Sequence, residues 1–177
     1  MCSNIKTTTG GSRTIYVQVA SARQNVVSER HRSVVAVAIN RPQVRNAVDR
    51  ETARRLLEEL KAFHSDDQLS VAVLHGKGGN FCAGYDLKEL ANHTAALKLE
   101  QDVTKSPGPM GPSRLQLSKP LIAAVSGYAV AGGLELALLA DLRVVEESAI
   151  MGVFCRRFVY LFKVLCSAYY TDSCTLS

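Results

Sequence analysis

The chain has 177 residues, of which 47% are hydrophobic and 21% are charged, and its formal net charge at pH 7 is +5. This length and composition are those of one soluble globular domain. No apolar run reaches the roughly 20 residues that a membrane-spanning helix needs. The five cysteines are odd in number and form no C-x-x-C pair, so we expect neither a zinc site nor a closed disulfide framework, and a reducing compartment fits best.

The N-terminal stretch carries only basic charges. Lys6, Arg13 and Arg23 occur among serines and threonines before the first acidic residue, Glu29. This composition resembles a mitochondrial presequence, whereas the apolar alternation at residues 15–19 is typical of a strand. We expect a mitochondrial location, with a cytoplasmic one as the alternative.

Basic residues also gather in the next part of the chain. The five arginines are Arg41, Arg45, Arg50, Arg54 and Arg55. Such a group favours an anionic partner. The alternative interpretation is the solvated basic face of a helix, which is common.

The first predicted strand is the apolar run Val34–Asn40, which ends where Pro42 interrupts it. Asp49 is placed to cap an amphipathic helix that ends near Ser65. The apolar residues at helical spacing are Ala53, Leu56, Leu57, Leu60 and Phe63. We expect this helix to lie on a sheet.

A second buried strand, Val71–Leu74, leads into a glycine-rich turn and then towards another helix. This alternation predicts right-handed βαβ units on a mainly parallel sheet. The turn is no phosphate loop, because Tyr85 and Asp86 follow its last glycine where the motif requires Lys and Ser or Thr, and no G-x-G-x-x-G occurs there. The segment Thr104–Pro112 is rich in proline and glycine and is expected to be a mobile surface linker.

The most informative stretch predicts a buried strand at Leu121–Val125, a glycine turn and a helix at Leu134–Leu142 that is apolar all round. Its first turn contains one carboxylate, Glu135. A carboxylate is favoured near a helix N-terminus for structural reasons alone. A glycine-opened helix start also presents unpaired N–H groups to a ligand, so Glu135 is either structural or an acid–base group.

Three blocks of the sequence resemble the enoyl-CoA hydratase/isomerase (crotonase) family. They are VVAVAINRPQVRNAV, GKGGNFCAGYDLKEL and SKPLIAAVSGYAVAGGLELALLADLRV, and they cover about Val34 to Met151 in the order of the family. The resemblance implies an α/β fold, a superhelix of repeated ββα units with two roughly perpendicular sheets, in place of a simple parallel sheet. It also implies trimers or dimers of trimers and an acyl-CoA or enoyl-CoA thioester as substrate, with no cofactor besides the CoA of that substrate.

The resemblance implies the site residues as well. The oxyanion hole of the family would use the backbone N–H groups of Tyr85 and Gly132, directed at the thioester oxygen on which charge develops. Glu135 matches the first of the two catalytic glutamates of the hydratases. The residues that match the substrate-binding region are Val44, Arg45, Ala83, Gly84, Asp86, Tyr128 and Gly133. Arg45 or a neighbour would meet the phosphates of CoA.

The sequence departs from the family further on. Cys155 stands where the family has its second glutamate, and no carboxylate lies between Glu147 and Asp172. Concerted hydration uses one group on the water and another that delivers a proton to the α carbon. The departure therefore argues against an ordinary hydratase more than against thioester chemistry.

The end of the chain, residues 158–177, resembles nothing in the family. We therefore expect an incomplete crotonase-like core at 29–157, preceded by an extension at 1–28, and a chain that folds and assembles poorly because apolar surface lacks its cover. One alternative is an inactive short form that binds acyl-CoA or family subunits. Another is RNA binding through the helix Arg50–Lys61, as in one branch of the family. We expect no membrane or DNA partner.

Overall fold

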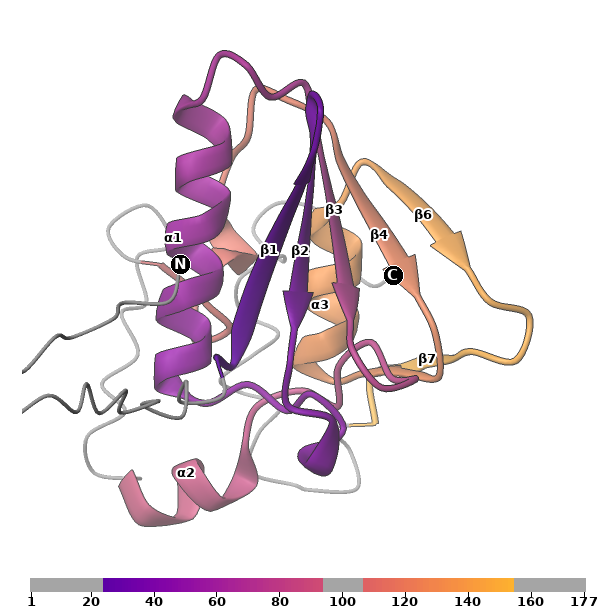
Figure 1. Cartoon of the computed structure of the whole chain (residues 1–177). Coiled ribbons are helices and arrows are strands. Elements are labelled where there is room, and N and C mark those ends of the chain that lie inside the picture. Colours follow the sequence, from indigo (N-terminus) through magenta and orange to yellow (C-terminus); the bar gives the residue numbers. More distant parts are fainter. Residues whose placement is uncertain (1–23, 94–106, 155–177) are drawn as a thin grey trace, which may run out of the picture.

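In the computed structural model the described residues are 24–93 and 107–154, and they form two sheets with helices on one side (Figure 1). The elements in chain order are β1 (Val26–His31), β2 (Val34–Ile39), the 3₁₀ turn η1 (Pro42–Val44), α1 (Arg50–Ser65), β3 (Val71–Gly76), α2 (Leu87–His93), the 3₁₀ turn η3 (Pro112–Arg114), β4 (Leu121–Val125), β5 (Tyr128–Val130), α3 (Gly132–Leu139), β6 (Leu142–Val145) and β7 (Ile150–Gly152).

The larger sheet has the strand order β1-β2-β3-β4-β6. β1 is antiparallel to β2, and the other neighbours are parallel. β5 and β7 form a separate parallel pair, which lies across the lower end of the larger sheet in Figure 1. The sequence of two strands and a helix occurs as β1–β2–α1 and again as β4–β5–α3, so the expected crotonase-like ββα architecture is confirmed.

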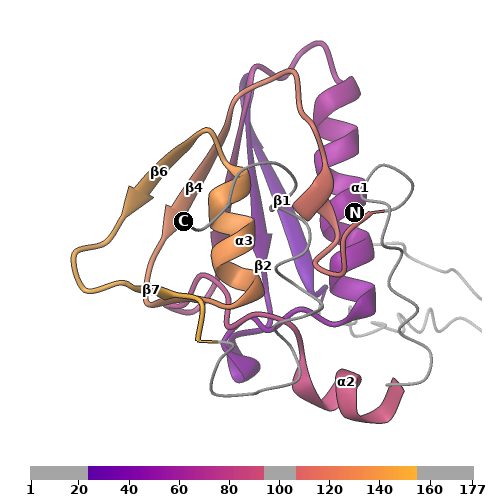
Figure 2. The same cartoon turned by 180° about the vertical axis from the view of Figure 1, so that it is seen from behind.

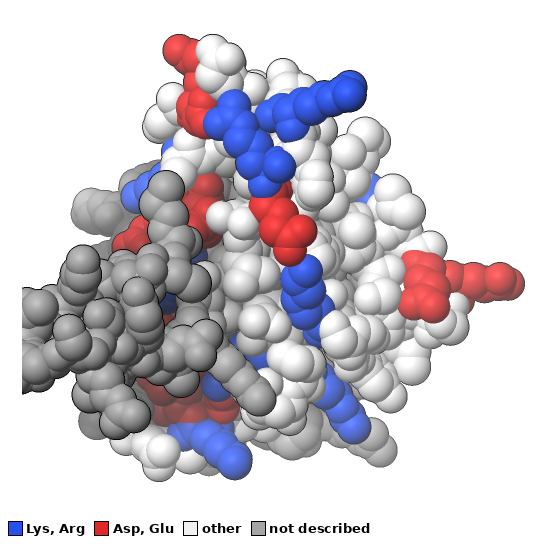
Figure 3. All heavy atoms as spheres, in the orientation of Figure 1, with Lys and Arg blue, Asp and Glu red and all other residues white. Residues whose placement is uncertain are grey.

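Both long helices cover the same face of the larger sheet, as the view from behind shows (Figure 2). Side chains alternate along parallel strands, and Val37, Leu74 and Ala123 occupy matching positions on three neighbouring strands. All three are buried on the helix side. The opposite face, seen in Figure 3, shows mostly uncharged atoms crossed by a line of charged side chains.

The helix α1 agrees with the sequence prediction. The carboxylate of Asp49 accepts a hydrogen bond from the Thr52 N–H at 2.8 Å, as a helix cap does. Leu56, Leu60 and Phe63 are fully or almost fully buried against the sheet. The capping residue and the spacing of the apolar residues were therefore sufficient to predict this helix.

The helix predicted at Leu134–Leu142 is wrong in its bounds, because α3 runs from Gly132 to Leu139. Asp141 ends it by pairing with β4: the Leu121 N–H donates to its carboxylate at 2.8 Å, and its own N–H donates to the Leu121 carbonyl at 2.9 Å. The chain then joins the sheet as β6. Leu142 belongs to that strand and is 62% exposed.

The surface linker predicted at Thr104–Pro112 is also wrong in the part that the structure describes. Met110 is completely buried, and Gly111 and Pro112 are buried beside it. Gly111 has a φ of 83° and its Cα lies against the backbone of Ala53 on α1, so a side chain at this position would collide with it. Tertiary packing, which composition does not report, fixes this segment.

Several predictions lie outside the described residues: the strand at 15–19, the role of Cys155 and the tail at 158–177. Among the described residues, no helix is long and apolar enough to cross a bilayer. Large apolar side chains are exposed on α3, β6, β7 and the two residues after β7. They are Leu138, Leu142, Val144, Val145, Ile150, Val153 and Phe154.

Candidate functional site

The predicted site residues gather at one end of the larger sheet. The carboxyl ends of β2, β3 and β4 point to this end, and α1 and α3 begin there (Figure 1). Loops at the carboxyl ends of parallel strands are the usual place for ligands in α/β proteins. Helix starts add unpaired N–H groups to the same region.

The loop after β3 runs parallel to β5. Cys82 pairs with Ala129 in an isolated parallel bridge. The Cys82 N–H donates to the Tyr128 carbonyl at 2.8 Å, and the Val130 N–H donates back to the Cys82 carbonyl at 3.1 Å. The residues after Cys82 therefore lie beside the chain that enters α3.

Glycines allow the two segments to approach closely. Gly84 has a φ of 96°, and a Cβ atom placed on it would lie 3.3 Å from the backbone nitrogen of Gly132. A Cβ atom on Gly133 would collide with the Cys82 carbonyl. The start of α3 is thus adjacent to the residue that precedes Tyr85, and the two predicted donors are brought together.

Both predicted donors are available to a ligand. In the described part of the chain, neither the Tyr85 N–H nor the Gly132 N–H donates to a protein acceptor. The neighbours of Tyr85 are engaged: the Gly84 carbonyl accepts from the Val48 N–H, and the Asp86 N–H donates to the Val48 carbonyl, both at 2.8 Å. Gly132 is the first residue of α3, whose N–H has no helical acceptor.

Ala131, just before α3, has φ 51° and ψ −124°. A residue with a Cβ atom is strained in this part of conformational space. The Ala131 N–H donates to the Gly152 carbonyl on β7 at 2.9 Å. The bond to β7 therefore holds the bend that precedes Gly132.

Glu135 lies in the first turn of α3, half-buried. Burial raises the pKa of its carboxyl group to about 7, while the positive charge of Arg114 acts in the opposite direction. A carboxyl group with this pKa can both take up and release a proton near neutral pH. The sulfur of Met110 lies beneath Gly132, where a Cβ atom would be 2.6 Å from it, so the buried segment that contains Arg114 supports this helix start.

Asn46 supports the site, although the sequence analysis did not identify it as a functional residue. It is completely buried with a φ of 57°. Its side-chain oxygen accepts from the Arg41 N–H at 2.8 Å, and its amide donates to the carbonyls of Lys77 and Asn80 at 2.9 and 2.6 Å. It therefore joins the loops that follow β2 and β3. The only sequence signal was an Asn in a turn, a residue that tolerates positive φ.

The predicted substrate-binding residues surround the loop after β3. Arg45 is exposed, and its guanidinium lies 5.4 Å from the centre of the partly exposed Tyr128 ring. The Ala83 N–H donates to the Arg45 carbonyl at 3.0 Å, and Val44 is half-buried before it. The carboxylate of Asp86 forms an ion pair with the guanidinium of Arg41 at 3.0 Å.

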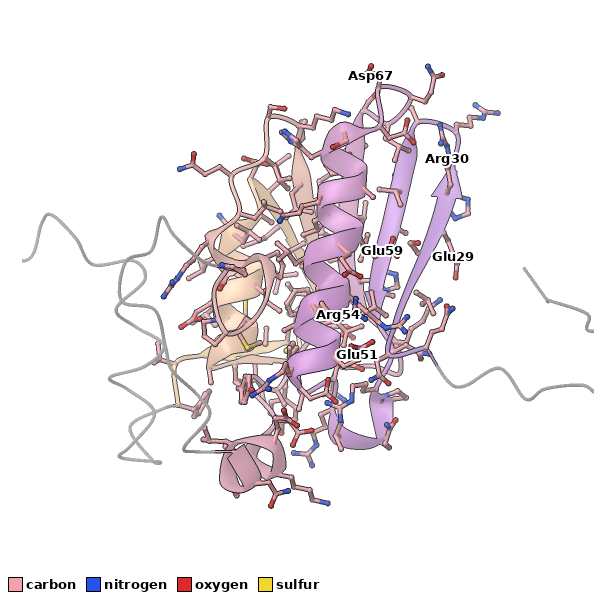
Figure 4. The ribbon with its side chains drawn as sticks, turned by 90° about the vertical axis from the view of Figure 1, so that its left-hand side faces the viewer. Glu29, Arg30, Glu51, Arg54, Glu59 and Asp67 are labelled. Atoms are coloured by element: carbon pink, nitrogen blue, oxygen red, sulfur yellow. The ribbon has the colours of Figure 1, made fainter. Side chains whose placement is uncertain are left out.

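Two of the three arginines of α1 are neutralised by glutamates of the same helix, and the third, Arg50, lies 3.9 Å from Glu89 of α2. Arg54 bonds Glu51 at 2.6 Å (Figure 4) and Glu58 at 2.5 Å, and Arg55 bonds Glu51 at 2.7 Å. Hydrogen bonds from Arg54 and Arg55 lower the pKa of Glu51 to about 2. This face is a solvated face of paired charges, so it gives little support to RNA binding. Of the five arginines, all described by the structure, Arg45 has no carboxylate partner.

The one cysteine in the described residues, Cys82, is no candidate nucleophile. It is completely buried and unpaired. Burial raises the pKa of its thiol to about 12, although the hydrogen bond with Gly84 opposes this. A thiol with such a pKa stays protonated and unreactive.

Comparison with known proteins gives one consistent family. Residues 29–159 match the model of the family described as Enoyl-CoA hydratase/isomerase. The 2,3-dehydroadipyl-CoA hydratase of Escherichia coli (strain K12) is 40% identical over 129 residues, which are 72% of this chain and 49% of that protein. The Homo sapiens "Enoyl-CoA hydratase domain-containing protein 2, mitochondrial" is 40% identical over 121 residues, 68% of this chain and 41% of that protein.

Solved structures agree. A probable enoyl-CoA hydratase/isomerase from Mycobacterium abscessus superimposes with a TM-score of 0.68 at 39% identity, over 78% of this chain and 51% of that one. An enoyl-CoA hydratase from Mycobacterium tuberculosis H37Rv gives a TM-score of 0.67 at 39% identity, over 76% and 50%. This chain spans about half the length of the relatives it matches.

Proposed function

The chain belongs to the enoyl-CoA hydratase/isomerase family, and from this premise we propose that it binds an acyl-CoA thioester and stabilises the enolate formed from it. The observation that carries the proposal is the pair of neighbouring N–H groups of Tyr85 and Gly132, neither of which donates to a protein acceptor among the described residues. Glu135 lies in the first turn of the helix that Gly132 begins. Donors set in advance against a developing charge are worth about 100- to 1,000-fold in rate for each donor.

The proposed chemistry is the removal and return of a proton at the carbon next to the thioester carbonyl. The Glu135 carboxylate takes the α-proton, and the electron pair moves onto the thioester oxygen. The N–H groups of Tyr85 and Gly132 donate to that oxygen while it is negative. A pKa of about 7 leaves Glu135 partly ionised at neutral pH, so it serves as base and then as acid.

Hydration of an enoyl-CoA would need a further group to activate water. Among the described residues Glu135 is the one carboxylate in the first turn of α3. The proposal therefore covers α-proton transfer and isomerisation, for which one base is sufficient, and does not include hydration. Arg45 is the proposed contact for a CoA phosphate, because it is exposed and free of carboxylates among those residues.

Binding is tested by thermal unfolding in the presence of crotonyl-CoA, longer enoyl-CoAs and free CoA. A ligand at 100 times its Kd stabilises the folded state by about 2.7 kcal/mol. We expect each thioester to raise the Tm more than free CoA does, because only the thioester oxygen engages the two N–H groups. A folded chain whose Tm no thioester changes would contradict the proposal.

Location and assembly are proposed from composition and from relationship to known proteins. The basic N-terminal stretch and the human and bovine relatives, whose names include "mitochondrial", support import into mitochondria, and imaging of a C-terminally tagged chain tests it against the cytoplasm. A trimer is proposed from the family assembly. Light scattering of the purified chain measures it.

A further inference from the structure

Arg41 is an unusual arginine, because it is nearly buried at the end of β2 and bound on several sides by this chain. Its side chain is 13% exposed. One guanidinium nitrogen lies 3.0 Å from the Asp49 carboxylate and 3.0 Å from the Asp86 carboxylate. The other terminal nitrogen donates to the Ala47 carbonyl at 2.5 Å. Such a planar group can hold several acceptors at fixed angles, which a lysine cannot.

The two carboxylates belong to the residues that follow a short bridge containing Tyr85. Val48 and Tyr85 form an isolated parallel bridge. Asp49 directly follows the first residue of this bridge, and Asp86 directly follows the second. Arg41 therefore links the two bridged segments, because it binds the residue that follows the bridge in each of them.

Each carboxylate has a second attachment. The other oxygen of Asp49 caps α1 by accepting from the Thr52 N–H at 2.8 Å, and the other oxygen of Asp86 accepts from the Lys88 N–H at 3.0 Å at the start of α2. Arg41 thus connects the end of β2, the start of α1 and the start of α2. Tyr85 directly precedes one of the two attached carboxylates, that of Asp86, and is bridged to Val48, which precedes the other.

The cluster is charged in the folded chain. Burial opposes ionisation of Asp86, but hydrogen bonds from Arg41 and from the Lys88 N–H outweigh this and lower the pKa of Asp86. Removal of one member of a buried charged group leaves the others without compensation. Loss of Arg41 would therefore leave the carboxylates of Asp49 and Asp86 without their shared positive charge.

We propose that Arg41 is a positioning residue that holds the Tyr85 N–H in the direction required to polarise a bound thioester carbonyl. The inference rests on the proposed function. It predicts that loss of Arg41 affects the carbonyl more than it affects the binding of the CoA portion, because no atom of Arg41 needs to touch the ligand. A donor displaced by about 1 Å can cost about 100-fold in rate.

The test uses 4-(dimethylamino)cinnamoyl-CoA, a conjugated thioester whose absorption moves to longer wavelength when its carbonyl is polarised. Titration gives a Kd and a shift of the absorption maximum for the full chain, Arg41→Gln and Arg41→Lys. The matched control is Arg30→Gln, which removes an exposed arginine paired with Asp66 at the same 3.0 Å, on β1 away from the site.

The expected result is that Arg41→Gln keeps its Kd within about threefold but loses most of the shift. Arg41→Lys should recover only part of the shift, and Arg30→Gln should keep all of it. A full shift in folded Arg41→Gln would overturn this inference but would leave the proposed function intact. No shift in the unsubstituted chain would overturn the proposed function, and this inference with it.

If Arg41→Gln does not fold, the same titration of Arg41→Lys and Asp49→Asn tests the inference. Asn at position 49 can still cap α1, so Asp49→Asn weakens the bond to Arg41 and leaves the helix start intact. A reduced shift in both variants supports the inference. A full shift in both overturns it.

Discussion

A Cβ atom on Gly84 would lie 3.3 Å from the backbone nitrogen of Gly132. This closeness places the N–H of the next residue, Tyr85, beside the start of α3. Two segments that are far apart in the sequence thus bring the two proposed donors close together. The relationship depends on residue 84 having no side chain and a φ of 96°.

Gly84→Ala should therefore lower both stability and thioester binding. The methyl group would be 3.1 Å from the Ala131 Cβ and 3.2 Å from the Val130 carbonyl oxygen, and the backbone would be strained by about 1–3 kcal/mol. Urea unfolding and a thioester titration measure the two effects.

Gly79→Ala is the control for that substitution. Gly79 has a φ of 80°, yet nothing lies within 4 Å of a Cβ atom placed on it. This variant should lose stability through strain alone and should keep thioester binding. Equal losses of binding in the two variants would show that the contact between Gly84 and Gly132 has no role.

Ala131→Gly should stabilise the fold. Ala131 has φ 51° and ψ −124°, and glycine adopts such angles without a steric penalty. We expect the free energy of unfolding to rise by about 1 kcal/mol in urea, the relief of strain being reduced by the greater freedom of the unfolded chain. Ala129→Gly, a nearby buried substitution without positive φ, should destabilise. A less stable Ala131→Gly would mean that Ala131 is unstrained.

The elements that the sequence predicted are those with local causes. The apolar runs of β2, β3 and β4 and the Asp49 cap of α1 are visible in a few neighbouring residues. The end of α3 was not, because Asp141 leaves the helix to bond Leu121 on a distant strand. Met110 was taken for part of a surface linker, since its burial under Gly132 depends on packing that a Gly- and Pro-rich segment does not reveal.

The site, too, combines residues that the sequence identified with contacts that only the fold reveals. Tyr85, Gly132 and Glu135 were identified by their resemblance to a family, but nothing in the sequence pairs Cys82 with Ala129, the contact that brings them together. The arginines were read as a group because they are close in sequence. The fold separates them into one buried connector, one exposed side chain and the paired charges of α1.

The pKa of Glu135 predicts a pH dependence of stability. Its value is about 7 in the folded chain against an ordinary value of 4.5. Between these values the folded state keeps a proton that the unfolded state has lost, so the free energy of unfolding falls as the pH rises through this window. The fall should be about 1–2 kcal/mol after allowance for solvent screening of this partly exposed group.

Glu135→Gln removes this dependence. The variant should be more stable than the parent chain at pH 8, and the two should converge at about pH 4.5, where the parent carboxyl group is protonated. Urea unfolding over this pH range measures the difference. Glu59→Gln on α1 (Figure 4) corrects for the loss of one charge. A difference that does not change with pH would mean that the Glu135 pKa is ordinary.

In the proposed reaction Glu135 removes the α-proton of a bound thioester and the N–H groups of Tyr85 and Gly132 stabilise the resulting enolate. The most direct measurement is the exchange of the α-protons of butyryl-CoA in deuterium oxide, followed by NMR. This saturated thioester cannot be hydrated, so exchange requires only a base and stabilisation of the enolate. It also separates an active chain from an inactive form that merely binds acyl-CoA.

We expect the folded chain to exchange these protons and Glu135→Gln to slow the exchange by at least about 100-fold. Butyryl-CoA should still raise the Tm of that variant, since Glu135 moves a proton and does not hold the CoA portion. Exchange at the same rate in the parent chain and in Glu135→Gln, or no exchange in a folded parent chain that binds butyryl-CoA, would contradict the proposed reaction.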